Sequence, residues 1–443
     1  QNTCGADIIK ESSNTITIGA SGDTVTLASG ASQTGFGRTG TVDWQTGSVK
    51  TATFTAANGE GYFANTSGGA FTMNLPAGTA GNIVSVVDYT NTFQTNNLTI
   101  APNGSQKIGG IAAQIALSTE GQSVTFVYVD DTEGWKNVQD STSNVTGNPF
   151  LQATGGTETT TGNCKIHTFT GPGTFTVSSA SQTAAENVVS YLVIGGGGGS
   201  GGDTGGGGGA GGYREVKSPL TPYTASPLDG YPSAPNRITV TAQAYPITVG
   251  SGGTDGGGGN CEAAPSGNNS VFSTITGAGG GGGGRGGGGA NVGGANGGSG
   301  GGGGATPGGG RSGGTGNTPP TSPAQGKNGG AGGPGTGNAG GGGGGANEVG
   351  QGGTNPPRAG GPGGAGVISE INGSPVRRAG GGGGGGACSP GSAGAGGGGV
   401  GSGSPGSTGC NGTVNTGGGG GGGGPSNANS GGSGIVIIRY KFK

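Results

Sequence analysis

The sequence predicts an all-β protein: antiparallel β-sandwich modules, then a glycine-rich domain of packed polyglycine-II helices on a small β-sandwich base. Three observations predict this fold class. Short segments of alternating apolar and polar residues end at Gly, Asn or Pro turns. Glycine blocks then dominate: 25 of the 125 glycines precede Gly195, and the other 100 lie between Gly195 and Gly434. Finally, we find no segment with a convincing helical period.

Residues 1–40 are predicted to form a separate N-terminal segment of short strands. Residues 14–19 and 23–30 alternate apolar and polar residues and each end at glycine, which indicates two short strands. One such pair is too small to bury a core by itself. Winding three copies about a common axis would solve that problem, so the sequence favours a homotrimer.

Residues 41–140 have an ordinary globular composition and predict a β-sandwich module. Turn signals separate the alternating segments. The predicted strands are Ala52–Thr55, Gly61–Ala64, Ala70–Leu75, Ile83–Asp88, Asn97–Ile100, Ile115–Ser118, Ser123–Val129 and Trp135–Val138. The predicted core residues are Trp44, Phe54, Phe63, Phe71, Phe126, Tyr128 and Trp135.

A polar Thr, Ser and Gly segment, residues 141–162, is predicted to be a linker to the tip domain, residues 163–443. The strands expected to build the β base of that domain are Ile166–Phe169, Thr174–Val177, Val188–Ile194, Ile238–Ala242, Ile247–Val249, Val271–Ile275 and Ile435–Tyr440. Polyglycine runs and loops are expected to fill residues 195–434, which lie in the sequence between the base strands Val188–Ile194 and Ile435–Tyr440.

The glycine blocks predict polyglycine-II helices. Ordering each glycine costs about 1–2 kcal/mol, and glycine has no side chain to bury in return. Backbone hydrogen bonds between closely packed chains must therefore hold the runs. An extended left-handed helix with three residues per turn directs its N–H and C=O groups outward and suits this purpose. Collagen is excluded, because its glycines recur at every third position whereas these occur in blocks.

Composition and charge exclude several classes of function. The net charge of −2 and a pI near 5.5 provide no electrostatic basis for nucleic-acid binding. No apolar run approaches the roughly 20 residues of a membrane span, so we expect no membrane insertion. With 28% hydrophobic residues, a single large core is not expected.

The five cysteines lack CxxC spacing, and the chain has one histidine, so we expect no metal site and no cofactor. Cys388 and Cys410 flank neighbouring glycine blocks and are a possible disulfide pair. Free or buried thiols are the favoured alternative.

Catalysis is not expected. His167 alternates with apolar residues in a predicted strand and has no identifiable nucleophile as a partner. Five acidic residues could in principle supply paired carboxylates for glycan cleavage: Glu60, Asp88, Asp130, Asp131 and Glu133. The segment 130–134 is better explained as a turn between two strands. We therefore predict a non-enzymatic protein without catalytic residues.

The best candidate for an exposed recognition loop is the insertion between Tyr213 and Tyr245. It contains Tyr223, Tyr231 and Arg237, and five prolines lie between Pro219 and Pro235. Tyrosines offer rigid contact area and prolines stiffen a loop. An equally weighted alternative is that the insertion merely covers the base. The further binding candidates are the arginines Arg311, Arg358, Arg377 and Arg378, although an isolated arginine is usually just solvated, and solvation is the favoured alternative for each.

Two parts of the chain resemble known phage proteins. Residues 41–110, from TVDWQTGSVK to APNGSQKIGG, and residues 120–139 (EGQSVTFVYVDDTEGWKNVQ) resemble a module of tail-fibre proteins of marine phages, including cyanophages. The second half resembles glycine-rich domains of phage fibres and adhesins. The matching segments are FTGPGTFTV (169–177), YLVIGGGGGSGG (191–202), YPITVGSGG (245–253), VFSTITGAGGGG (271–282) and GGSGIVIIRYKF (431–442).

The resemblance implies a tail fibre of the virion, assembled in the host cytoplasm. It also implies that loops between polyglycine-II helices bind a bacterial receptor, a glycan or an outer-membrane protein. Trimer formation and attachment to other virion proteins through the N-terminal segment are expected as well. Two alternatives stay open: a decoration fibre of the head, neck or tail without receptor binding, and a bacterial glycine-rich surface protein.

Overall fold

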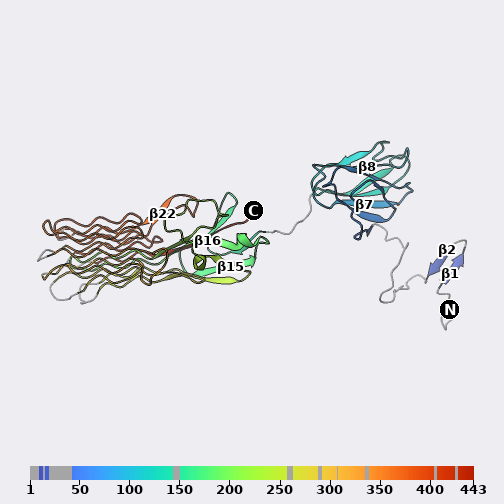
Figure 1. Ribbon diagram of the computed structural model, residues 1–443. Coiled ribbons are helices and arrows are strands. Elements are labelled where there is room, and N and C mark those ends of the chain that lie inside the picture. The colour runs from blue at the N-terminus through green and yellow to red at the C-terminus, as the bar shows by residue number, and fades with distance from the viewer. Residues whose placement is uncertain are drawn as a thin grey trace, which may run out of the picture. The chain divides into compact units, whose positions relative to one another are not determined.

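The structure is a computed structural model with two units, residues 1–147 (unit 1) and 148–443 (unit 2). It describes residues 9–12, 15–18, 42–142, 150–256, 263–287, 292–306, 308–334, 339–403, 407–424 and 428–443. The all-β prediction is confirmed, because the described helices are two short 3-10 turns, η1 (Ala184–Asn187) and η2 (Ala234–Asn236) (Figure 1). In these residues no helix has the length and apolar character needed to cross a membrane.

The first described strands of unit 1 form an antiparallel hairpin of β1 (Ile9–Ser12) and β2 (Thr15–Ile18). Strand β2 falls within the predicted segment 14–19. The predicted strand 23–30 lies outside the described residues.

Two sheets form the part of unit 1 that is described between residues 42 and 142. The first has the order β11 (Trp135–Ser141), β10 (Ser123–Tyr128), β7 (Ile83–Asp88), β5 (Glu60–Ala64) and β3 (Asp43–Trp44). The second has the order β4 (Phe54–Thr55), β6 (Phe71–Asn74), β8 (Leu98–Ala101) and β9 (Ile115–Leu117). All eight strands predicted between residues 41 and 140 occur, with small shifts of their ends, and β3 is an addition.

The strand directions differ from the antiparallel arrangement predicted for this module. Strands β3 to β8 alternate between the two sheets, so each turn of the chain adds one strand to each sheet. Successive strands of one sheet therefore run the same way: β3 with β5, β5 with β7, β4 with β6 and β6 with β8 are parallel pairs. Strands β9, β10 and β11 return as antiparallel partners.

The core of unit 1 lies between these sheets and contains Phe71, Phe126, Tyr128 and Trp135 as predicted, with Phe54 packed at its margin. The prediction is wrong for Trp44, which is 41% exposed. Phe63 is half-buried and lies outside the core cluster. Its neighbours Tyr62 and Ala64 point inward, so strand alternation directs Phe63 to the opposite face.

Unit 2 begins with a base of two sheets. One has the order β12 (Gln152–Thr154), β15 (Gly173–Ser179), β19 (Ala244–Thr248), β20 (Ser270–Phe272) and β21 (Ile275–Gly277). The other has the order β13 (Thr157–Thr161), β14 (Cys164–Phe169), β24 (Ile435–Lys441), β16 (Val188–Ile194) and β17 (Tyr213–Val216), and β18 (Ile238–Thr239) also pairs with β16. A hairpin of β22 (Val367–Ser369) and β23 (Val376–Arg378) forms a separate two-stranded sheet, and its Val367 packs with residues of β16 and β24. The last strand, β24, thus occupies the middle of its sheet.

The predicted linker is corrected in its second half, because residues 152–161 contribute β12 and β13 to the base. Every residue of β13 is exposed, yet the whole strand pairs with β14. Backbone pairing at the sheet edge holds β13 in place, so its side chains need not be buried. Its sequence of Thr and Glu therefore resembles that of a polar linker.

The glycine runs form a bundle that extends away from β15, β16 and β22 (Figure 1). The central run, residues 205–212, shows its organisation. The N–H groups of Gly206, Gly207 and Gly208 donate to Gly284, Gly341 and Gly420, which belong to three different runs. The N–H groups of Gly209 and Gly212 donate to the run that contains Gly284. Those of Ala210 and Gly211 donate to the runs that contain Gly341 and Gly420, respectively. This three-residue repeat agrees with the predicted polyglycine-II arrangement.

The carbonyl groups of the same run accept from three further runs. Gly207 accepts from Gly302, Gly208 from Gly382 and Gly209 from Gly198. Six neighbouring runs therefore surround the central one. A Cβ atom on Gly208 would lie 2.0 Å from the carbonyl oxygen of Gly198, so the spacing between runs requires glycine there.

Candidate functional site

The far end of the glycine bundle is the first candidate site. The run after β16 leaves the base, reverses at residues 202–204 and returns to β17. Backbone hydrogen bonds connect this reversal to the ends of other runs: Asp203 donates to Gly424 at 2.9 Å and Gly286 donates to Gly202 at 3.1 Å. We call this the distal end. Its described residues include Asp203, Thr204, Arg285, Gly286, Arg311, residues 354–359 and residues 388–390.

The loop at residues 354–359 shows how the distal end is held. Thr354 and Ala359 exchange both backbone hydrogen bonds, at 2.9 and 3.1 Å. The Asn355 amide donates to the carbonyl of Pro334 at 3.1 Å, and the Cys388 N–H donates to Arg358 at 2.9 Å. The Arg358 side chain is exposed. A fixed backbone therefore presents an exposed cation.

The possible disulfide between Cys388 and Cys410 is not formed, since both are free, exposed thiols. Their backbones are held by different partners. Cys388 donates to Arg358 in the neighbouring loop, whereas Cys410 donates to Val400 and accepts from Gly421. The favoured alternative of free thiols therefore holds for these two cysteines, and the possible pair does not.

Three predicted receptor contacts belong to the interior of the base end. Tyr213 and Arg378 are only 2% and 7% exposed, and Tyr223 is half-buried. The Tyr213 hydroxyl donates to the Glu215 carboxylate at 2.8 Å, and Ser369 donates to the same carboxylate at 2.5 Å. These contacts assign Tyr213 to the packing of the base, and burial assigns Arg378 to it as well, so both are corrected as receptor contacts.

Burial also changes the protonation chemistry of this cluster. It raises the pKa of Tyr213 well above its usual value, and the nearby Glu215 carboxylate acts in the same direction. Burial lowers the pKa of Arg378, which Tyr213 and Glu215 partly oppose. Burial likewise raises the pKa of Tyr223, whose ring lies 5.1 Å from the Arg439 guanidinium.

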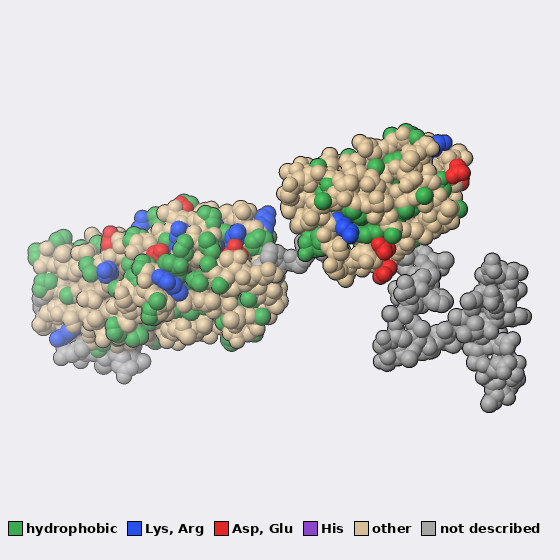
Figure 2. Space-filling model, turned by 45° about the vertical axis from the view of Figure 1, so that its right-hand side comes forward, with side chains coloured by type: hydrophobic (Ala, Val, Ile, Leu, Met, Phe, Trp, Pro, Cys, Tyr) green, Lys and Arg blue, Asp and Glu red, His purple; other side chains and the backbone are tan. Residues whose placement is uncertain are grey.

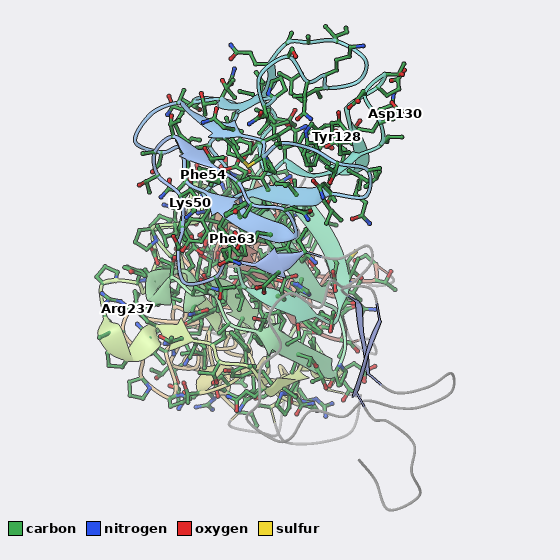
Figure 3. The ribbon with its side chains drawn as sticks, turned by 90° about the vertical axis from the view of Figure 1, so that its right-hand side faces the viewer. Lys50, Phe54, Phe63, Tyr128, Asp130 and Arg237 are labelled. Carbon is green, nitrogen blue, oxygen red and sulfur yellow. The ribbon has the colours of Figure 1, made fainter. Side chains whose placement is uncertain are left out.

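The rest of the predicted insertion lies along the side of the base. Tyr231 packs against the hydrophobic core, and the exposed Arg237 lies 4.4 Å from its ring. Figure 3 shows Arg237 beside the short helix η2 at the periphery of unit 2. For Tyr213, Tyr223 and Tyr231, the alternative that the insertion covers the base therefore fits the structure better than an exposed recognition loop.

The structure separates the candidate arginines between the two ends of unit 2. Arg311 and Arg358 lie at the distal end, whereas Arg237 and the exposed Arg377 lie at the base. Figure 2 shows charged side chains scattered singly over the visible face of this unit. Asp203, Thr204 and Asn355 are distal residues that sequence reasoning missed. A glycine run that leaves the base must reverse at the distal end before it returns. Counting these reversals from the base strand Val188–Ile194 would therefore have assigned the three residues to the distal end.

The residues considered for catalysis occupy structural positions. His167 lies on β14 as predicted and is 0% exposed. Its Nδ1 is 2.6 Å from the Gly155 carbonyl and its Nε2 is 3.1 Å from the Tyr440 hydroxyl, and burial lowers its pKa. Asp130 begins the predicted turn and accepts the N–H groups of Thr132 and Glu133, both at 2.8 Å. Within the described ranges, no group of three or more His, Cys, Asp and Glu residues could hold a metal ion.

Together, the base and the bundle define a class of protein in which a side-chain-poor glycine scaffold carries loops at one end. The family model described as a glycine-rich domain matches residues 168–441, and the chain belongs to this family. The match begins in β14 and ends in β24, so it includes the base as well as the runs. No curated protein matches the chain.

Proposed function

We propose that this chain is a bacteriophage tail-fibre adhesin that recognises a bacterial surface receptor, without catalysis, through its distal loops. The observation that carries the proposal is the gathering of exposed loops at one end of a bundle held by backbone hydrogen bonds. Recognition residues commonly lie on loops that a rigid scaffold positions. The resemblance of residues 41–110 and 120–139 to tail-fibre proteins of marine phages supports the assignment to a phage fibre.

The bundle explains why recognition would fall to the loops. In the central run the backbone N–H and C=O groups bond to neighbouring runs, and glycine offers no side chain for a partner. The distal loops instead present the exposed Arg358 and the half-buried Asp203 and Asn355 on a backbone that is already fixed. Little further ordering is needed on binding, which reduces its entropic cost.

The proposed partners follow from the same resemblance. Three copies would associate, residues 1–40 would attach to other virion proteins, and the receptor would be a glycan or an outer-membrane protein. The virion tail fibre is the corresponding location. A decoration fibre that binds the virion rather than the host is the main competing function.

The test compares two matched double variants of the full chain on intact marine cyanobacteria. Arg311→Ala/Arg358→Ala changes the distal end, whereas Arg237→Ala/Arg377→Ala changes the base. We expect saturable cell binding by the parent chain, at least about a tenfold loss in the distal variant, and little change in the base variant. Circular dichroism and melting curves verify that both variants fold.

Each other outcome changes the assignment. Binding lost only in the base variant would place the contact surface on the side of the base. A folded parent chain that binds none of the cyanobacterial strains tested would favour the decoration fibre.

A further inference from the structure

The outer face of the five-stranded sheet in unit 1 exposes a row of aromatic side chains. Trp44 is 41% exposed and Tyr89 is 55% exposed, and the half-buried Phe63 lies between them. The ring centroids are 5.3 Å apart for Trp44 and Phe63, and 6.2 Å apart for Phe63 and Tyr89. Figure 3 shows Phe63 among the strands of unit 1. The three rings form one contiguous aromatic surface outside the core.

Gly61 lets the indole of Trp44 lie against β5. Trp44 and Gly61 are partners in the parallel pairing of β3 with β5. A Cβ atom on Gly61 would lie 2.6 Å from the Trp44 ring, so a larger residue there would displace the indole. The Trp44 ring therefore lies against β5, while much of it is exposed to solvent.

Hydrogen-bonding groups border the aromatic surface. A groove beside Trp44 is lined by Val86 of β7 and by residues of β10 and β11, namely Ser123, Val124, Thr125, Val138, Gln139, Asp140 and Ser141. A neighbouring hollow is lined by Trp44, Thr46, Phe63, Val87 and Ser123. The described lining of both contains hydroxyls, one amide and one carboxylate, but no Lys or Arg. Such a surface complements a neutral ligand rich in hydroxyl groups and disfavours phosphate or sulfate.

We propose that this face binds a neutral oligosaccharide. The weakly positive C–H groups on one side of a sugar ring would lie against the negative faces of Trp44 and Tyr89. The sugar hydroxyls would exchange hydrogen bonds with Ser123 and Gln139, which project to this face of β10 and β11. The site is in unit 1 and does not depend on the distal loops of unit 2.

Tryptophan fluorescence isolates the proposed site. The chain has two tryptophans, and Trp135 is 0% exposed, so a ligand on the sheet face would change the emission of Trp44 alone. The full chain is titrated with linear neutral hexaoses of glucose, mannose and galactose. We expect a saturable emission change with at least one of them.

Three variants define the expected result, with affinities measured by calorimetry. Tyr89→Ala removes an exposed ring and should weaken binding about fivefold to tenfold. Trp44→Phe should lose the emission change and weaken binding. Ile111→Ala, which removes a 67% exposed apolar side chain elsewhere in unit 1, should leave binding unchanged.

The proposal is overturned if none of the three hexaoses changes the emission of the parent chain or produces heat on calorimetry. It is also overturned if Tyr89→Ala binds sugar as the parent does. If Tyr89→Ala and Trp44→Phe instead dissociate an oligomer in sedimentation, the face is an interface between copies. Because the readout is sugar binding in solution, its failure is distinguishable from a failure of cell adhesion.

Discussion

The glycines of the central run combine two roles: they occupy almost no space and they supply the hydrogen bonds that hold the bundle. A Cβ atom on Gly211 would lie 1.9 Å from the carbonyl oxygen of Gly195. That oxygen belongs to backbone, which cannot move aside as a flexible side chain can. Alanine is nevertheless accommodated at Ala210, which is 0% exposed. The requirement for glycine is therefore a property of each position rather than of the run as a whole.

The first prediction compares two glycine substitutions. Gly208→Ala should lower the free energy of unfolding of unit 2 by about 3 kcal/mol, because its Cβ would overlap the Gly198 carbonyl, 2.0 Å away. Gly308→Ala is the control, because no atom lies within 4 Å of its added Cβ. The control should change stability by less than about 0.5 kcal/mol in chemical denaturation. Equal effects of the two substitutions would argue against backbone contact as the reason for glycine.

The second prediction concerns the pH dependence of His167. Burial lowers its folded-state pKa below the unfolded value of about 6.5, so the folded base favours the neutral ring. The resulting stability is fully present above about pH 6.5. It declines as pH falls toward the lowered pKa, by up to about 1.4 kcal/mol per pH unit. Glu158, with an oxygen 3.9 Å from Nδ1, partly opposes this shift, whereas Lys165 reinforces it.

Melting curves of unit 2 between pH 7.5 and 5.5 provide the measurement. His167→Gln should be less stable than the parent at neutral pH and should lose the part of the pH dependence that histidine contributes. A parent melting temperature that stays constant across this interval would contradict the assignment.

At the scale of elements, β24 joins the two halves of its sheet. It pairs with β14 on one side and with β16 on the other, and its first six residues are buried. The run before it contributes hydrogen bonds from Gly431, Gly432 and Gly434. The strand therefore connects the β base to the glycine bundle.

The third prediction follows from this position. Truncation after Gly434 removes β24 and leaves β14 and β16 without a shared partner. We expect loss of the cooperative unfolding transition of unit 2, measured by circular dichroism and proteolysis. Truncation after Lys441 removes Phe442 and Lys443 and should retain the transition. An unfolding transition that survives removal of β24 would show that the bundle holds the base together without it.

At the scale of the whole molecule, each unit has its own hydrophobic interior. The fourth prediction is that the two units unfold separately. Leu98→Ala removes a fully buried side chain from unit 1 and should destabilise that unit by about 2–5 kcal/mol. Gly208→Ala should shift only the transition of unit 2. Trp135 fluorescence follows unit 1, so a shift of that signal in Gly208→Ala would contradict independent unfolding.

Local patterns predicted the strands well, because alternation and burial are properties of a short segment. Strands β7 and β16 have the predicted bounds, Ile83–Asp88 and Val188–Ile194. The sequence could not reveal β13, since all its side chains are exposed, or the winding that makes β5 and β7 parallel. Both depend on pairing with distant strands.

The candidate site was predicted less well for the same reason. Tyr213 resembles a loop tyrosine in sequence, but β17 pairs with β16 and turns it toward Glu215. Arg311 and Arg358 were identified as candidates, but their shared location at the distal end depends on the directions of the runs between them. Composition identifies residues suited to recognition, whereas topology determines which of them face solvent together.

The bonding of the central run also affects how the protein is made. Residues 205–212 depend on partners at 278–284, 340–345 and 417–423, so the contact order is high. A ribosome must release most of unit 2 before this run can complete its bonds, and β24 is synthesised later still. Until then the nascent segment has strand edges without partners and few side chains with which to collapse. Folding of unit 2 is therefore expected to be slow and largely post-translational, whereas unit 1 can fold while synthesis continues.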